Sequence, residues 1–472
     1  MQRAARQPQS TARRFLALLV LEFIAWMTAN SAQVPELATS QVPEPTLPAG
    51  TIITMFRHSD ETKYWISGQM NFIFQYHPPF YAAYSGTNSL QPQAETDHSR
   101  VLTLYTGYEF TPSIEVIADF EEAGGFGFSG THGVAGFPNL DSVRQPDLGP
   151  QPYLARLFYH QVVGFGTEKV SANRGPLALF TALQARRLEL RVGKFSLVDF
   201  FDINGVNGDS HLQFLNWAID QNASYDFAAD PRGYTWGVIV EYQCKKWGLR
   251  FGEAVMPVSD GLEWNLRKGN TSNFEFELHR GFLKTKDGII RVMAYINNAN
   301  MGVYQYANEQ YLKGKVVPPN LSAHPEWLTT KYGFGVNFEH ALGASILLGG
   351  RFGWNNGKTE TWSFTEADQT IAAGIGFIGN LWKRNYDRAG LAFFTNGITS
   401  EHAQYLAYGG LGLVLGDGGL QYGRETGIAS YYTAHIWRGI YAGPDLQFIV
   451  HPGYNTARGP VFVPSARLHL EF

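Results

Sequence analysis

From residue 64 onward, apolar and polar residues alternate with a period of two, the pattern of strands whose two faces meet different environments. In the last run, Leu468 and Leu470 share one face, and Arg467 and His469 share the other. Sixteen such runs occur, and each predicts a strand, at residues 64–76, 100–110, 113–121, 153–163, 187–195, 233–243, 246–257, 273–284, 288–298, 330–340, 344–354, 371–381, 386–396, 422–436, 440–450 and 461–472.

The connections between these runs alternate between short and long. Short ones such as 111–113 and 243–246 follow long ones such as 77–99 and 196–232, and only 164–186 breaks the rule by being long. Short periplasmic turns and long extracellular loops are typical of outer-membrane barrels, whose strands need about 10 residues to cross the bilayer. Strands can cross lipid only in a closed barrel, because an open edge leaves backbone groups unpaired.

We therefore predict an all-β fold, a transmembrane antiparallel β-barrel of about 16 strands. The chain ends on Phe472 at the close of a strand, as such barrels usually do. The alternative is a water-soluble sandwich or propeller, which also alternates but packs its apolar faces inward. Here the polar faces carry full charges while the apolar faces are aromatic, which favours the membrane barrel.

Composition excludes several other classes. Charged residues are only 17% and aromatic residues 14%, unlike disordered chains or coiled coils. A net charge of −4 offers no basic surface for nucleic acid. The single cysteine, Cys244, excludes a disulfide framework. Beyond residue 30 no run of 18 apolar residues occurs, so a bundle of membrane helices is excluded.

The N-terminus has the pattern of an export signal. Basic residues up to Arg14 precede an apolar stretch, and small residues at 29–32 would suit cleavage. The alternative, a membrane anchor, needs a longer apolar run. We expect a signal peptide at 1–32, a Pro-rich periplasmic N-terminal lead at 33–63 and the barrel at 64–472.

The polar faces of the runs, which should line the lumen, carry 12 acidic and 9 basic residues. An anion pore would need a basic excess and a cation pore an acidic ring. A near-balanced wall instead suits an uncharged solute with many hydroxyl groups, because carboxylates and guanidinium groups accept and donate hydrogen bonds. Lys194 falls on the lipid-facing side of its run, which predicts a bulge, a rim position or an error of register nearby.

Two stretches, 191–237 and 409–472, resemble the OprB-type carbohydrate-selective porins of bacterial outer membranes. The similar motifs are RVGKF, FLNW, YDFAADPRGYTWG, GDGGLQYGRE, PGYN and ARGP, and PYLARLF at 152–158 fits as well. The resemblance implies passive, sugar-preferring diffusion of mono- or oligosaccharides through a polar constriction, without energy coupling or cofactors. It also implies export to the bacterial outer membrane, with small sugars and membrane lipid as partners.

Candidate pore-lining or constriction residues follow from face, position and motif. The long loop after the fifth run is expected either to fold inward and narrow the channel or to cap the barrel mouth. Any single wall charge could instead belong to an ion pair that braces the wall. The candidates are Trp65, Glu115, Asp119, Arg156, Glu189, Arg191, Asp202, Asn216, Trp217, Arg232, Arg351, Glu425 and Arg467.

Two rival functions stay open at this stage. A general or differently selective porin for small polar solutes or ions could use the same barrel. An enzyme at the barrel rim is disfavoured, because the sequence has no GxSxG, HExxH or paired CxxC motif. The sequence leaves open whether copies of the chain form a homo-oligomer, and which sugar is preferred.

Overall fold

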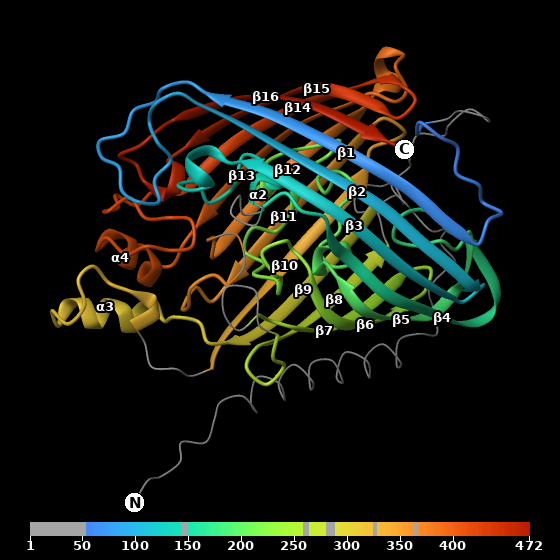
Figure 1. Cartoon of the computed structure of the whole chain (residues 1–472), viewed down its shortest axis with the longest axis horizontal. Helices are drawn as coiled ribbons and strands as arrows, with labels where there is room; N and C mark the ends of the chain where they lie inside the picture. The colour runs from blue at the N-terminus through green and yellow to red at the C-terminus, as the bar shows by residue number, and fades with distance from the viewer. Residues whose placement is uncertain are drawn as a thin grey trace, which may run out of the picture. The chain divides into compact units, whose positions relative to one another are not determined.

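The computed structural model describes residues 53–143, 149–257, 264–279, 288–323, 328–362, 364 and 366–472. The expected signal peptide and residues 33–52 of the expected lead lie outside the described residues. The described chain forms sixteen strands that close into one antiparallel barrel, which confirms the predicted fold (Figure 1).

Each strand lies close to a run predicted from the alternation. The strands are β1 (Tyr64–His77), β2 (Glu95–Thr111), β3 (Ile114–Phe126), β4 (Tyr153–Ser171), β5 (Ala182–Phe195), β6 (Thr235–Gln243), β7 (Trp247–Val255), β8 (Asn270–His279), β9 (Gly288–Ala299), β10 (Thr329–Ala341), β11 (Ile346–Asn355), β12 (Gln369–Ile378), β13 (Arg388–Gly397), β14 (Glu425–Trp437), β15 (Ile440–Val450) and β16 (Val461–Glu471).

Consecutive strands pair with one another, and β1 pairs with β16 to close the barrel. At this seam Phe72 lies opposite Leu468 and Asn71 lies opposite His469. Closure satisfies the backbone groups that an edge strand would leave unpaired, as a strand in lipid requires.

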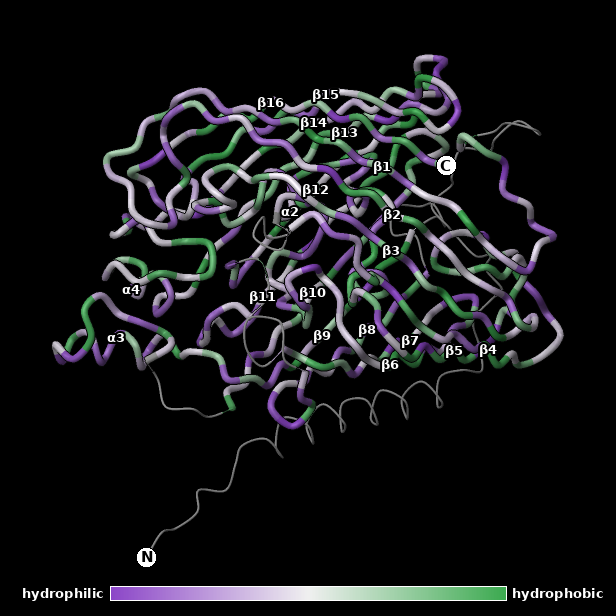
Figure 2. Tube along the Cα trace, in the orientation of Figure 1, coloured by the Kyte–Doolittle hydropathy of each residue, from purple (hydrophilic) through white to green (hydrophobic). Residues whose placement is uncertain are grey.

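The two faces of the strands divide as the sequence predicts. Large apolar side chains point outward, and Leu391 and Ile428 each keep 50% of their surface exposed there. Arg467 and His469 point inward and are buried. The alternation is visible along the strands as changing hydropathy (Figure 2). An exposed apolar belt of this extent is expected only where a protein meets lipid or another apolar surface.

Short helices occur in the connections. They are α2 (Trp217–Asp220), α3 (Tyr304–Leu312), α4 (Ser400–Ala407) and the 3-10 turns η1 (Phe128–Gly130), η2 (Leu140–Val143), η4 (Leu197–Asp199), η5 (Leu321–Ala323), η6 (Gly379–Trp382) and η7 (Pro452–Tyr454). α2 contacts β12 and β13, whereas α3 packs against α4 beyond the strands (Figure 1). Within the described ranges, no helix is long and apolar enough to cross a membrane.

The two ends of the barrel differ in their connections. We call the end with residues 78–94, 196–234 and 398–424 the long-loop end, and the opposite end the turn end. The irregular connection 164–186 is shorter than predicted, because β4 and β5 extend past the other strands and leave only 172–181 between them. Lys194 proves to be a rim residue: it lies next to the last residue of β5, and its ammonium group is 3.4 Å from Asp230.

The interior is more apolar than the strand pattern suggested. Inward-facing Phe394 and Tyr431 of the wall join a buried cluster with Phe214 and Trp217, which come from the connection between β5 and β6. The rings of Phe214 and Tyr431 meet edge to face at 4.7 Å. Connections that fold into the barrel bring apolar side chains with them, so part of the wall must be apolar to pack against them.

Candidate functional site

The connection 196–234 between β5 and β6, here called the inner loop, folds into the barrel. It starts with η4, where Ser196 and Asp199 form a reciprocal capping box. The guanidinium group of Arg156 donates to both carboxylate oxygens of Asp199, at 2.8 and 2.7 Å. This charge-assisted, two-point contact fixes the start of the inner loop to the wall at β4.

The middle of the inner loop is fixed by Asp202, whose backbone has a positive φ of 60°. Arg351 donates to Asp202 Oδ2 at 2.8 Å, and Asn337 donates to Oδ1 at 3.0 Å. The Asp202 backbone N–H donates to Glu275 at 2.8 Å. Residues of three strands, β8, β10 and β11, therefore hold Asp202 in a backbone conformation that is uncommon for residues other than glycine.

The far part of the inner loop reaches the opposite wall. Arg467 of β16 donates to the Gln213 carbonyl at 2.6 Å. The side chain of Asn216 caps α2 by accepting from Ala218 N–H at 3.0 Å, and it donates to Gln447 of β15 at 3.1 Å. The inner loop thus crosses the lumen from β4 to β15 and β16, which supports the inward-folding alternative over a simple cap.

The two candidate tryptophans have different surroundings. Trp217 is buried, with the rings of Phe137, Phe227 and Phe364 at 5.9, 6.3 and 5.3 Å. This packing favours a structural role for Trp217, because its ring is covered by other rings. Trp65 faces inward near the turn end, and its Nε1–H donates to Ser67 at 2.6 Å.

A series of paired charges, here called the wall ladder, follows the inner surface from β3 to β10. His160 bridges Glu115 and Glu189 at 2.6 and 2.9 Å. Arg191 and Arg250 both pair with Glu241, at 3.1 and 2.8 Å. The wall ladder comprises Glu115, His160, Glu189, Arg191, Glu241, Arg250, Glu275, Glu277, Arg291 and Glu339. These side chains are buried, so most of their hydrogen-bonding capacity is used within the protein.

Several wall carboxylates accept hydrogen bonds from the backbone of connections that fold inward. Glu425 accepts from the N–H groups of Ala135, Gly136 and Gly453 at 2.9, 2.7 and 2.8 Å. Glu339 accepts from Gly205 at 2.7 Å. Burial of a carboxylate is costly unless the carboxylate accepts hydrogen bonds. These contacts therefore show that carboxylates of the wall attach the inserted connections to the barrel.

The two remaining candidates lie in the long-loop half of the barrel. Asp119 is buried, with a carboxylate oxygen 3.5 Å from Arg156. Arg232 donates to the Gly149 carbonyl at 2.8 Å, and its guanidinium carbon lies 4.4 Å from the centre of the Tyr153 ring. Arg232 therefore joins the inner loop to the neighbouring connection at the rim.

The tip of the inner loop, around Asp209 and His211, presents groups to the lumen that were not among the candidates predicted from the sequence. The side chains of Asp209 and Arg388 are each 37% exposed, and their charged atoms lie 3.9 Å apart. His211 Nδ1–H donates to Gln69 Oε1 at 3.1 Å. Arg388 was counted among the inward charges, but no motif pointed to Asp209.

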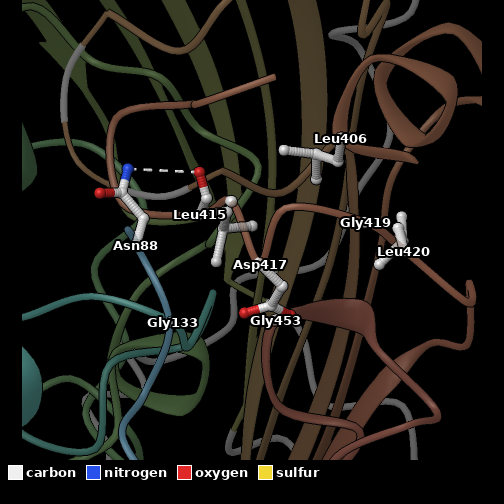
Figure 3. A pocket seen from close by; sticks show the side chains of 9 residues that line it. Asn88, Gly133, Leu406, Leu415, Asp417, Gly419, Leu420 and Gly453 are labelled. Atoms are coloured by element: carbon white, nitrogen blue, oxygen red, sulfur yellow. Dashed lines mark hydrogen bonds between the residues drawn. The ribbon is translucent and has the colours of Figure 1, made fainter. Parts of the chain in front are cut away.

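At the long-loop end, four connections meet around a small pocket (Figure 3). Asn88 donates across it to the Leu415 carbonyl at 3.3 Å. Asp417 accepts from Asn455 at 2.9 Å and lies 3.7 Å from Arg458. Burial raises the pKa of Asp417 above its usual range, although Arg458 and the donors from Ser89 and Asn455 act in the opposite direction. Residues of the GDGG, PGYN and ARGP motifs thus contact one another here and hold the loops together.

Within the part of the chain that the structure describes, no group of three or more His, Cys, Asp or Glu side chains could hold a metal ion. The arrangement consists of a closed barrel, a loop across its lumen and an exposed acid–base pair at the tip of that loop. Such an arrangement can offer hydrogen bonds to a solute that passes through the barrel.

Comparison with known proteins places this geometry in a family. The family model described as carbohydrate-selective porin, OprB family, matches residues 85–472. A search of curated proteins found no match. The high-pH structure of Pseudomonas putida OprB superposes with a TM-score of 0.65 at 14% identity, covering 87% of this chain and 94% of that one.

Two further solved structures are more distant. The low-pH structure of the same Pseudomonas putida protein gives a TM-score of 0.45 at 10% identity, covering 87% of this chain and 93% of that one. The outer membrane channel DcaP of Acinetobacter baumannii gives 0.49 at 7% identity, covering 89% of this chain and all 100% of that one. The barrel, its inner loop and the match over most of its length lead to one conclusion: the chain belongs to the OprB family of carbohydrate-selective porins and is a sugar-preferring porin of the bacterial outer membrane.

Proposed function

We propose that sugars cross this barrel through a passage bordered by the tip of the inner loop, with Asp209 and Arg388 as the solute-binding pair. The observation that carries the proposal is their exposure of 37% each inside a barrel whose other paired charges are mostly buried. A solute in the lumen therefore meets these two groups, whereas the wall ladder is occupied by protein partners.

The chemistry of the pair suits an uncharged polyol. The carboxylate accepts from sugar hydroxyl groups and the guanidinium donates to them, while the two charges cancel for a passing ion. The charged atoms of Asp209 and Arg388 lie 3.9 Å apart and are in contact with water, so we expect the pair to bind a sugar weakly. Weak binding allows the sugar to be released on the other side.

The predicted wall residues would then act as positioning residues of the constriction. Arg156, Asp202 and Arg351 hold the inner loop in the lumen, and Arg467 holds its far part. Glu115, Glu189, Arg191 and Glu425 belong to the wall contacts that keep this and other connections in place. In this proposal transport is passive diffusion without a covalent step, and the outward apolar belt contacts membrane lipid.

Planar-bilayer recordings test the proposal. Titrating a sugar should reduce the ion current through the wild-type channel, and Asp209→Asn and Arg388→Gln should each raise the half-blocking sugar concentration several-fold. Lys313→Gln is the control, since Lys313 pairs with Glu309 on the surface of α3 and lies outside the lumen. Unchanged half-blocking concentrations in both lumen variants would contradict the assignment of this pair.

A further inference from the structure

The connection between β4 and β5 is one of two described turn-end connections that are not tight turns; the other is 379–387, which contains η6. Residues 112–113, 244–246, 342–345 and 438–439 are tight turns, whereas 172–181 is a longer stretch, here called the tucked segment. Its tip is a tight turn in which Gly175 and Ala178 exchange backbone hydrogen bonds. A connection of this length on the short side of a barrel calls for an explanation, because a two-residue turn suffices to join neighbouring antiparallel strands.

The tucked segment returns into the barrel at the turn end. The Leu179 backbone N–H donates to the wall carboxylate of Glu115 at 2.8 Å, and the Leu179 side chain is completely buried. A Cβ atom placed on inward-facing Gly107 would lie only 2.9 Å from both Leu179 and Ile117. Leu179 therefore packs on the inner surface of β2 and β3 and occupies space that belongs to the lumen.

Phe180 occupies the neighbouring part of the wall. It is buried against Val162 and Leu183, and its ring centre lies 5.5 Å from that of His160 in the wall ladder. The two consecutive apolar residues thus cover the polar inner surface of β3, β4 and β5. Apolar side chains on a polar wall reduce the number of hydrogen bonds that the wall can offer to a solute there.

Arg174 fixes the tucked segment to the start of β1. Its side chain is only 3% exposed, and it donates to the carbonyl groups of Leu179, Thr62 and Tyr64 at 2.8, 2.6 and 3.0 Å. Its guanidinium carbon lies 5.8 Å from the centre of the Trp65 ring. A buried arginine with three carbonyl acceptors holds one conformation, so the tucked segment is a fixed part of the wall.

The tip of the inner loop reaches the turn end on the other side of the barrel. Val206 is buried with Ala341, Leu347 and Ile378, which lie at the turn ends of β10, β11 and β12. The tucked segment covers β2–β5, so the two inserts line different sectors of the same end.

We propose that the tucked segment narrows the turn end from the side opposite the inner-loop tip, so that Leu179, Phe180 and Arg174 set the largest sugar that can leave the barrel. This inference depends on the chain being a porin and is independent of solute binding by Asp209 and Arg388. The apolar surface of Leu179 and Phe180 limits the width of the exit without adding binding affinity. The tucked segment would select by size, whereas the exposed acid–base pair would select by hydrogen bonding.

The test replaces residues 172–181 by a two-residue Asn-Gly turn, which suits a tight hairpin. Single-channel conductance should rise, and liposome swelling should extend to larger oligosaccharides, while the half-blocking concentration of a monosaccharide stays the same. Arg174→Gln should release the segment and increase the noise of the open-channel current. Arg186→Gln is the matched control, because Arg186 is exposed on the outer face of β5 in the same hairpin.

Assembly of each variant is checked by the shift in gel mobility between heated and unheated samples. An assembled replacement variant with unchanged conductance and unchanged size limit would overturn the proposal. A change in sugar affinity without a change in size limit would also overturn it, because the segment would then belong to the binding passage. Should the replacement not assemble, Arg174→Gln decides alone: a current indistinguishable from that of Arg186→Gln refutes the size-limiting role of the tucked segment.

Discussion

At the scale of single residues, the inward carboxylates are the points where loops attach to the wall. Glu425, Glu115 and Glu339 each accept hydrogen bonds from the backbone of an inserted connection. A carboxylate has several acceptor positions, so it can hold consecutive N–H groups that no strand partner satisfies. The sequence shows these residues as polar lumen positions, but their partners come from distant parts of the chain and become visible only in the fold.

Glu425→Ala should destabilise the barrel. The change leaves three buried backbone donors without an acceptor, and each unsatisfied donor costs about 1–3 kcal/mol. We expect a clearly lower unfolding temperature in detergent, measured by circular dichroism. Glu309→Ala, on the exposed side of α3, should leave that temperature nearly unchanged, and equal effects of the two substitutions would contradict the attachment role of Glu425.

At the scale of elements, the helix pair at the long-loop end depends on one histidine. His402 of α4 stacks on Tyr304 of α3 at 4.2 Å and donates through Nδ1 to Asp368 at 3.3 Å. Burial alone would lower the pKa of His402, but the carboxylates of Asp368 and Glu366 raise it to about 9. The imidazolium ion therefore joins both helices to the connection that precedes β12.

The docking of α3 and α4 should weaken at alkaline pH. The pKa of His402 rises from 6.5 to about 9 on folding, so its contribution is complete below pH 6.5 and is lost as the pH rises through 9. Limited proteolysis of the 398–424 connection at pH 6 and pH 10 measures this, and cleavage should be faster at pH 10. His402→Gln should remove most of the pH dependence; a variant that keeps it would point to another titrating group.

The strand faces allow a test of membrane orientation. Phe393, near the middle of β13, points outward and is exposed. Phe393→Arg should cost about 2–4 kcal/mol in the bilayer, since a cation at the midplane lacks solvation. We expect poor assembly into lipid vesicles, measured by heat-modifiable gel mobility. Leu470→Arg, near the turn end of β16, should have a smaller effect, and Phe393→Leu should assemble normally.

The strands could be predicted because each carries its own two-residue pattern. The extensions of β4 and β5 and the path of the inner loop could not, since they depend on contacts such as Arg156–Asp199 and Arg467–Gln213 between residues far apart in sequence. The inward face of Trp65 follows from the alternation, whereas the sequence left open whether the loop with Asp202 folds inward or caps the barrel mouth. Asp209 was missed, because a single acidic residue in a polar turn carries no pattern that shows whether it meets solvent, protein or solute.

At the scale of the whole molecule, the lumen combines many charges with little net charge. Each of the three Arg residues of the wall ladder pairs with two of its six Glu residues, and the exposed pair at the inner-loop tip has one charge of each sign. The electrostatic field along the passage is therefore weak, both for cations and for anions.

The channel should accordingly show weak ion selectivity. In a tenfold gradient of potassium chloride we expect a reversal potential near zero. Arg388→Gln leaves Asp209 without its counter-charge and should shift the reversal potential toward cation preference. A strong preference of the wild-type channel for one sign would show that unpaired charges dominate the passage.

The inner loop also has a mechanical consequence. It is attached to β4 through Arg156 and to β16 through Arg467, and between them to β8, β10 and β11. A cylinder of strands held only by its own ladder hydrogen bonds can flatten when the surrounding bilayer presses on it from one side. A strut across the cylinder resists that flattening, so lateral pressure on this porin should change the width of its passage little.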